Sequence, residues 1–172
     1  MHEGRRRQYL KRLYRAQQQQ TPVVYIDETG FESSTERLFA WGPPGKRLFD
    51  FRSGQKRQRT SLIGGYLQQK LLAPLLFQGT CNTAVFNAWL EQALLPKLQP
   101  GTILILDNAT FHRAESTRQL VLQAGCRLLF LPPYSPHLNP IEKLWANVKR
   151  AWRYASHLSL DAFLKTSLYI WD

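Results

Sequence analysis

The chain has 172 residues, of which 44% are hydrophobic and 20% charged, and a formal net charge of +11 at pH 7. Its length and composition are typical of one globular domain with a buried core and exclude a wholly disordered chain. No apolar run approaches the roughly eighteen residues of a membrane span, so a membrane partner is not expected. The excess of Lys and Arg indicates nucleic acid or another anionic partner, the alternative being a basic protein that has none.

Residues 1–20 are predicted to form a basic N-terminal arm or linker. Tyr9, Leu10, Leu13 and Tyr14 recur at helical spacing among Arg and Lys residues, which predicts a short amphipathic helix. Two roles stay open for this segment: an arm that contacts DNA through its basic side, or a solvated linker.

Residues 21–172 are predicted to form one α/β domain with a mixed sheet flanked by helices. Its first half contains strand-like segments, in the order VVYID, RLFAW, KRLFDF, SLIGGYLQ and KLLAPLLF, with a turn at GPPG and a bulge or bend at Gly64–Gly65. The second half alternates helices and buried strands: NTAVFNAWLEQALLPKL (capped at Asn82 or Thr83), TILILD, AESTRQLVLQAG (ended by Gly125), CRLLFL, PIEKLWANVKRAWRYA and a last helix from near Ser159. This order predicts an antiparallel meander followed by parallel strands joined by helical crossovers.

Cys81 and Cys126 have neither metal-binding spacing nor a disulfide framework. They are interpreted as small buried residues in a reducing compartment. The basic N-terminus is not followed by the apolar core of a signal peptide. We therefore expect a cytoplasmic, DNA-associated protein.

Three acidic residues stand out by their positions. Asp27 follows VVYI, Asp107 follows TILIL, and Glu142 lies in the first turn of the PIEKLW helix. Functional sites of α/β sheets gather at the carboxyl ends of strands, and carboxylates from separate elements suit the oxygen coordination of Mg²⁺. The three positions therefore predict one metal site.

Each of the three acids also has a purely structural interpretation. Asp27 or Asp107 can start a turn by accepting a hydrogen bond from its own backbone. Glu142 can complete a capping box with Asn139 as N-cap and Pro140 at the first helical position. Other carboxylates rank lower: Glu28 should point to the opposite face of its strand, and the remaining ones lie in loops or hairpins, namely Glu32, Glu36 and Asp50.

Three segments carry a resemblance to a known family. IDETGF, LDNATFH and LPPYSPHLNPIEKLWANVK, in this order, resemble the catalytic domain of DDE transposases of the mariner-related insertion-sequence group, over about Val23 to Arg150. The resemblance implies a ribonuclease H-like fold with a catalytic, metal-binding triad, formed here by Asp27, Asp107 and Glu142. Asn108, His112 and Asn139 are supporting candidates. His112 either orients a carboxylate or phosphate or is structural.

The resemblance also implies a reaction and its partners. The expected activity is metal-dependent DNA cleavage at transposon ends, followed by strand transfer of the 3′-hydroxyl into target DNA. Two Mg²⁺ ions, with Mn²⁺ as an alternative, would lie roughly 3.5–4 Å apart in such a site. Double-stranded DNA and a homo-oligomeric assembly are the expected partners. Since residues 1–20 leave no room for a helix-turn-helix, that half is expected from another reading frame.

Basic residues outside the site are candidates for binding DNA phosphates, although each alone is also explained as a solvated charge. They are Arg52, Lys56, Arg57, Arg59, Lys143, Lys149, Arg150 and Arg153. Two alternatives to the transposase stay open. One is a host nuclease of the same fold that cleaves without joining; the other is a catalytically inactive DNA-binding remnant or accessory subunit.

Overall fold

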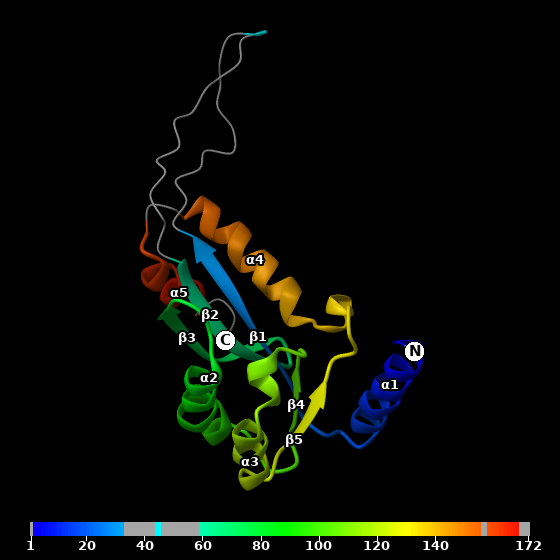
Figure 1. Ribbon diagram of the computed structural model, residues 1–172. Coiled ribbons are helices and arrows are strands. Elements are labelled where there is room, and N and C mark those ends of the chain that lie inside the picture. Colours follow the sequence, from blue (N-terminus) through cyan, green and yellow to red (C-terminus); the bar gives the residue numbers. More distant parts are fainter. Residues whose placement is uncertain (1, 33–43, 46–58, 156–157, 169–172) are drawn as a thin grey trace.

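The computed structural model describes residues 2–32, 44–45, 59–155 and 158–168. A five-stranded sheet forms the centre, and helices cover both of its faces (Figure 1). The strands are β1 Val23–Glu32, β2 Arg59–Leu67, β3 Lys70–Gln78, β4 Ile103–Leu106 and β5 Arg127–Phe130. The α-helices are α1 His2–Gln18, α2 Thr83–Trp89, α3 Glu115–Gln123, α4 Ile141–Tyr154 and α5 Leu160–Leu168. Short helical turns are η1 Leu90–Leu94, η2 Leu95–Lys97, η3 Thr110–Arg113 and η4 Pro136–Leu138.

The sheet is mixed, as predicted. Its strand order is β3-β2-β1-β4-β5; β1, β2 and β3 pair antiparallel, whereas β4 is parallel to both β1 and β5. The register of β2 against β3 shifts between Ile63 and Gly65, which confirms the predicted bulge. The segments RLFAW and KRLFDF lie outside the described residues. In the part of the chain that the structure describes, no helix has the length and apolarity to cross a membrane.

β1 is longer than the sequence predicts. It continues through the polar residues after Asp27, because β2 pairs with it as far as Glu32. Asp27 therefore lies inside a strand, opposite Gly64, and not at a strand end as predicted. The pairing of Tyr25 with Ile105 continues the parallel register toward the end of β4. Asp27 is consequently level with the residue that directly follows β4, Asp107.

One face of the sheet is covered by α2, η1 and α3. Inward-facing residues of β1 and β4 pack there against these helices, and the cluster includes Val24, Ile26, Leu104, Leu106, Phe86, Trp89, Leu94 and Val121. The predicted cap of α2 is confirmed, since the Asn82 side chain accepts a hydrogen bond from the backbone N–H of Val85 at 3.0 Å. This layer forms the floor beneath the candidate site.

The opposite face is covered by α4 and α5 over β1 and β2, and by α1 over β4 and β5 (Figure 1). The predicted helix near the N-terminus is confirmed as α1, but Leu10 and Tyr14, which the sequence pattern assigns to its apolar side, are exposed. Its Tyr9 and Ala16 are each 3% exposed and pack in one cluster with Ile105 and Leu129. The division of the chain into an arm (1–20) and a catalytic domain (21–172) stays a prediction.

β5 differs from its prediction as a fully buried strand. It is the edge strand of the sheet, and Arg127 is exposed while Leu129 is buried. The apolar sequence CRLLFL is explained by packing on both faces, against α3 and α1, and not by a further strand.

Candidate active site

The three acidic residues line one cleft of about 440 Å³. Asp27 comes from β1, Asp107 directly follows β4, and Glu142 lies in the first turn of α4. The loop 131–136 forms much of the remaining wall, and Asn108 and Asn139 also line the cleft. The structure thus brings together all three acids that the sequence singles out.

Strand alternation decides which acids face the cleft. Side chains of successive strand residues point to opposite faces of a sheet. In β1, Ile26 packs with α2 and Phe31 packs with α4, so Asp27 is on the α4 face and Glu28 is on the α2 face. The prediction that Glu28 points away from Asp27 is confirmed by its contact with His112, described below.

Asp27 is the carboxylate most affected by its surroundings. Its burial, the charge of Glu142 and the charges of Glu28 and Asp107 raise its pKa to about 7. A cation bound beside Asp27 would stabilise the charged form of this carboxylate and lower its pKa again. The cleft therefore has the electrostatics of a cation site.

Asp107 is held by hydrogen bonds to one of its two oxygens. Its Oδ1 accepts from the backbone N–H of Ala109 at 2.8 Å and from Nδ1 of His112 at 2.6 Å. The hydrogen bond from His112 lowers the pKa of Asp107, and the bond from Ala109 acts in the same direction. The hydrogen bond from Ala109 is the turn-starting contact that the sequence suggests for Asp107. It involves only Oδ1 and is therefore compatible with binding of a metal ion by Asp107. No hydrogen bond to Oδ2 is present among the described residues.

His112 links the cleft to a second carboxylate beneath the sheet. It is fully buried, its Nε2 lies 3.1 Å from Oε1 of Glu28, and its ring centroid lies 4.4 Å from that of Phe86. Burial favours the neutral ring, but the hydrogen bonds to Asp107 and Glu28 outweigh it and raise the pKa of His112 to about 9. His112 is therefore a cation that donates to both carboxylates. This geometry corresponds to the interpretation of His112 as an orienting residue.

The sequence pattern places Glu28 below the three acids as a candidate site residue, but in the structure it contacts His112, which in turn holds Asp107. Glu28 and His112 are 84 positions apart, and only the packing of η3 beneath β1 brings them together. The available signal was the pair Asp27–Glu28 itself, because adjacent acids of a strand present one carboxylate to each face.

The capping box predicted for Glu142 is not formed. The N-cap of α4 is Pro140 and not Asn139 as the sequence interpretation has it, and α4 has no side-chain cap hydrogen bond. The Oδ1 atom of Asn139 is buried without a hydrogen-bond partner in the described chain, and Glu142 is exposed to the cleft. Asn139 is 5% exposed, so its side chain belongs to the cleft wall. The structural interpretation of Glu142 as a cap is therefore wrong.

A close approach between α4 and β2 holds Glu142 over the sheet. Trp145 lies three residues after Glu142, on the same helix face, and is 2% exposed. A Cβ atom on Gly64 would lie 3.4 Å from the Trp145 ring and 2.6 Å from Cδ1 of Leu71. Since Gly64 pairs with Asp27, the space of its missing side chain beside the acidic cluster is taken by Leu71, with the Trp145 ring of α4 directly above it.

The donor set of the cleft fits a hard divalent cation. Mg²⁺ prefers carboxylate oxygens, together with water and substrate phosphate oxygens. Asp27, Oδ2 of Asp107 and Glu142 supply carboxylates, and the unpaired Oδ1 of Asn139 is a further acceptor. Among the residues that the structure describes, no three His, Cys, Asp or Glu side chains are close enough together to hold one metal ion.

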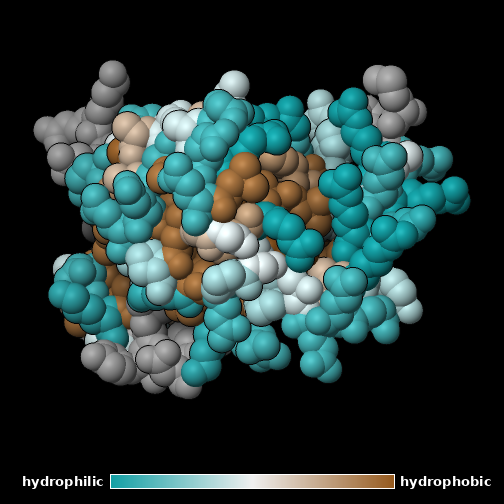
Figure 2. All heavy atoms as spheres, turned by 90° about the horizontal axis from the view of Figure 1, so that it is seen from below, coloured by the Kyte–Doolittle hydropathy of each residue, from teal (hydrophilic) through white to brown (hydrophobic). Residues whose placement is uncertain are grey.

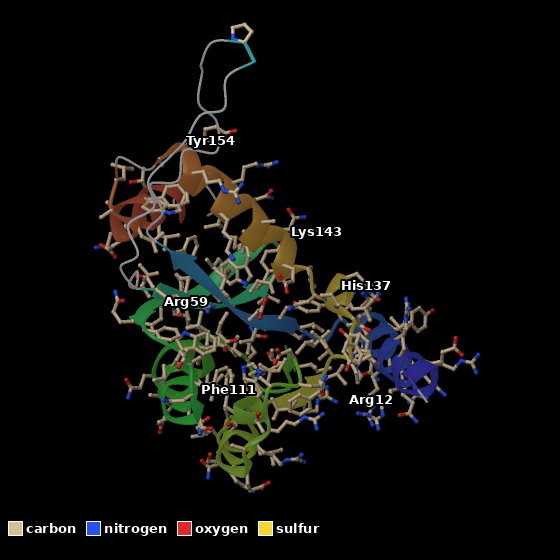
Figure 3. All side chains as sticks on the ribbon, turned by 45° about the horizontal axis from the view of Figure 1, so that its top comes forward. Arg12, Arg59, Phe111, His137, Lys143 and Tyr154 are labelled. Carbon is tan, nitrogen blue, oxygen red and sulfur yellow. The ribbon has the colours of Figure 1, made fainter. Side chains whose placement is uncertain are left out.

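Of the predicted DNA-binding residues, Arg52, Lys56 and Arg57 lie outside the described residues, and the described ones do not line the cleft. Arg59 is the first residue of β2, and its side chain covers Gly30 of β1. The basic residues of α4 are Lys143, Lys149, Arg150 and Arg153. Lys143, at the start of α4, points away from the sheet, and Arg59 lies on the other side of the molecule (Figure 3). Their role in DNA binding stays a prediction.

Solved structures of the Mos1 transposase have a similar fold. The chain matches a pre-cleavage Mos1 transpososome with a TM-score of 0.68 at 21% identity, covering 86% of this chain and 48% of that chain. It matches the Mos1 mariner paired end complex with Mn at 0.68 and 23%, covering 86% and 48%. For the Mos1 catalytic domain with Raltegravir and Mg the values are 0.63 and 20%, covering 98% and 79%. These matches show the ribonuclease H-like fold, and the chain spans about half the length of the longer Mos1 chains.

Sequence comparisons assign the family. An uncharacterized protein, y4pE/y4sA of Sinorhizobium fredii (strain NBRC 101917 / NGR234), is 42% identical over 50 residues, which cover 29% of this chain and 35% of that protein. The model of the DDE superfamily endonuclease family matches residues 22–164, which include β1 to β5 and the acidic cleft. The chain belongs to the DDE superfamily endonucleases.

Proposed function

We propose that this chain is the catalytic part of a transposase that cuts DNA at transposon ends and joins the 3′-hydroxyl to target DNA. The observation that carries the proposal is the convergence of Asp27, Asp107 and Glu142 on one cleft. The family match and the likeness to the Mos1 catalytic domain support it.

The three acids are proposed to hold two Mg²⁺ ions, with Mn²⁺ as an alternative. When bound, such ions activate the attacking oxygen and stabilise the leaving oxygen of an in-line phosphoryl displacement. The chain itself positions the ligands. His112 and Ala109 fix one oxygen of Asp107, which leaves Oδ2 for coordination.

The fold restricts the movement of the proposed metal-binding side chains to different extents. Asp27 is fixed by a strand that is paired on both sides, whereas Glu142 extends from the first turn of a helix. A side chain at a helix start can adjust by rotation about its χ angles. We therefore expect Glu142 to move most when the ions and a phosphate bind.

We also propose the partners of this reaction. Double-stranded DNA, both transposon end and target, is the substrate, and a homo-oligomer is the working assembly. A separate helix-turn-helix half would recognise the transposon ends. The protein would be cytoplasmic and DNA-associated.

The test is a nicking and joining assay in Mg²⁺ or Mn²⁺. The substrates are supercoiled plasmid for cleavage, and a pre-cut duplex with a free 3′-hydroxyl plus target plasmid for joining. We expect Asp27→Asn, Asp107→Asn and Glu142→Gln each to lose both activities by at least about a hundredfold, because each removes an ionised ligand. Glu91→Gln, an exposed acid on η1, is the matched control and should retain activity.

The outcomes separate the candidate functions. Near-normal cleavage by Asp107→Asn would overturn the assignment of the site. Cleavage without joining would indicate a nuclease of the same fold. DNA binding with no cleavage under any metal condition would indicate an inactive remnant or an accessory subunit.

A further inference from the structure

A second and larger cavity, of about 790 Å³, adjoins the acidic cleft. It lies between α1, the open edge of β5 and α3. Five arginines line it: Arg5, Arg12, Arg113, Arg118 and Arg127. None of the described residues that line it is acidic. We call this cavity the arginine groove.

The packing of α1 creates the groove. Tyr9 and Ala16 seat the helix on β4 and β5, and Arg5 and Arg12 then face the edge of the sheet. These two arginines are seven residues apart, so they lie on one helix face about 10 Å apart along the axis. Arg12 extends from α1 toward the body of the domain (Figure 3).

The groove combines positive charge with an apolar floor. Leu122 of α3 is 55% exposed, and the Arg113 guanidinium lies 5.4 Å from the centroid of the Phe130 ring. On the face seen from below, hydrophobic side chains are exposed in the middle and hydrophilic side chains surround them (Figure 2). Such a surface suits a ligand with repeated negative charges and flat apolar groups between them.

The groove shares a wall with the acidic cleft. Four residues line both cavities: Asn108, Leu131, Pro132 and Pro133. Arg113 donates a hydrogen bond to Oδ1 of Asn108, and Nδ2 of Asn108 donates to the carbonyl oxygen of Leu131 at 2.6 Å. A chain-like ligand in the groove would therefore lie next to the cleft, on the other side of this shared wall.

The arginines are available for a ligand. Arg118 has one exposed ion pair, with Glu115 at 3.7 Å, and surface pairs of this kind contribute little. Arg127 donates to the carbonyl oxygen of Gly101 at 3.3 Å. Arg5 and Arg12 have no ion pair with any acid that the structure describes.

We propose that the arginine groove binds the sugar-phosphate backbone of the DNA strand that leads out of the acidic cleft. This rests on the proposed function, because it takes the cleft to hold a phosphodiester. Of the two roles left open for residues 1–20, it assigns the DNA-contacting one, with α1 as one wall of the DNA path. Contacts between arginine and the DNA backbone contribute electrostatic attraction and fix the position of the DNA, but they do not read its base sequence.

The test compares two double variants of α1 with the same change in charge. Arg5→Gln/Arg12→Gln removes two groove arginines, and Arg6→Gln/Arg7→Gln removes two exposed arginines of the same helix that do not line the groove. Affinity for a labelled duplex with a single-stranded extension is measured by fluorescence anisotropy in EDTA, over a range of salt concentrations. Circular dichroism checks that both variants are folded.

The groove variant is expected to bind roughly 20- to 60-fold more weakly at 0.1 M salt, with a salt slope lower by about 1.4–1.8, as for two lost phosphate contacts. Arg6→Gln/Arg7→Gln should lose much less. Arg118→Gln/Arg127→Gln, on the opposite wall, should repeat the groove result. Equal losses in both α1 variants would overturn the proposal, since they would indicate a general effect of charge. A changed oligomeric state of the groove variants in sedimentation would also overturn it, because the open β5 edge would then be an interface between copies.

This test is independent of catalysis. Weaker binding of the groove variants supports the proposal even if no variant cleaves DNA. Conversely, if the wild-type protein cleaves and the groove variants bind normally, the groove proposal fails and the proposed function stands.

Discussion

At the scale of single residues, the cleft is organised by the contrast between Asp27 and Asp107. Asp107 is stabilised in its ionised form by His112 and a backbone N–H, whereas Asp27 is raised to a pKa of about 7 by burial and by other carboxylates. Asp107 is thus already ionised and able to bind a cation, whereas ionising Asp27 is unfavourable in the metal-free protein. Folding and function oppose each other at Asp27.

This opposition predicts that Asp27→Asn stabilises the metal-free protein. The carboxyl has a pKa of about 7 in the folded state against an ordinary value of 3.8, so the folded state binds more protons between these pH values. Stability contributed by the wild-type residue is therefore lost as pH rises from about 4 to 7. Above pH 7 we expect Asn to increase the free energy of unfolding by about 2–4 kcal/mol.

The measurement is thermal or urea unfolding in EDTA at several pH values. The difference between Asp27→Asn and wild type should grow from pH 5 to pH 8. Glu91→Gln serves as the exposed control and should show no such trend. A difference that does not change with pH would contradict the assigned electrostatics.

His112 gives a second prediction at this scale. His112→Phe fills the space beside Phe86 but removes the hydrogen bonds to Asp107 and Glu28. Since partners of metal ligands typically contribute about 10- to 100-fold, we expect a loss of this size in cleavage or in apparent Mg²⁺ affinity. Titrating cleavage against Mg²⁺ at fixed DNA measures it, with DNA affinity in EDTA unchanged.

Glu28→Gln is the matched comparison, because it keeps a hydrogen-bond acceptor beside His112 and removes only the charge. Its loss should be smaller than that of His112→Phe. Equal and full activity of both variants would show that the orientation of Asp107 does not depend on this link.

At the scale of elements, the placement of α4 depends on a position without a side chain. Gly64 of β2 lies opposite Asp27 and beneath Trp145, one helical turn from Glu142. We expect Gly64→Val to displace α4 outward and to reduce cleavage by more than tenfold, because a displacement of about 1 Å is sufficient for such a loss. Cleavage rate compared with melting temperature tests this.

Gly79→Val provides a contrast, since no atom lies within 4 Å of the position where its Cβ would be, although its positive φ strains any side chain. It should lose stability without a specific loss of cleavage in the folded fraction. If Gly64→Val loses stability and activity in the same proportion as Gly79→Val, the close approach does not position Glu142.

The elements also show what the sequence can and cannot predict. β4 and α4 were predictable because their apolar patterns are strong and local. The extension of β1 was not, because the polar residues after Asp27 are in a strand only through pairing with β2, where Thr29 is buried. The edge position of β5 and the contact of Glu28 with His112 depend on strand order and on packing across long separations, which no local pattern encodes.

At the scale of the whole molecule, acidic and basic groups are separated by the architecture. The acids of the cleft, Asp27, Asp107 and Glu142, converge near the end of β4. The arginines of α1, η3, α3 and β5 gather around the adjacent sheet edge. A net charge of +11 is therefore not spread evenly around the site. The cleft attracts cations and the groove attracts a polyanion, so the metal ions and the DNA of the proposed reaction are drawn to neighbouring places.

The pairing of β1 on both sides has a consequence for how the gene can change. Because neighbouring strand residues face opposite ways, losing a single codon just before Asp27 would turn Glu28 into the cleft and leave His112 without its partner. The cleft would still contain three carboxylates, yet one would be longer, and His112, which supports Asp107, would have lost its contact with Glu28. Frame-preserving deletions in β1 would thus yield proteins that retain the acidic signature but have a damaged site, so a count of acids is a poor guide to which copies of such a gene are active.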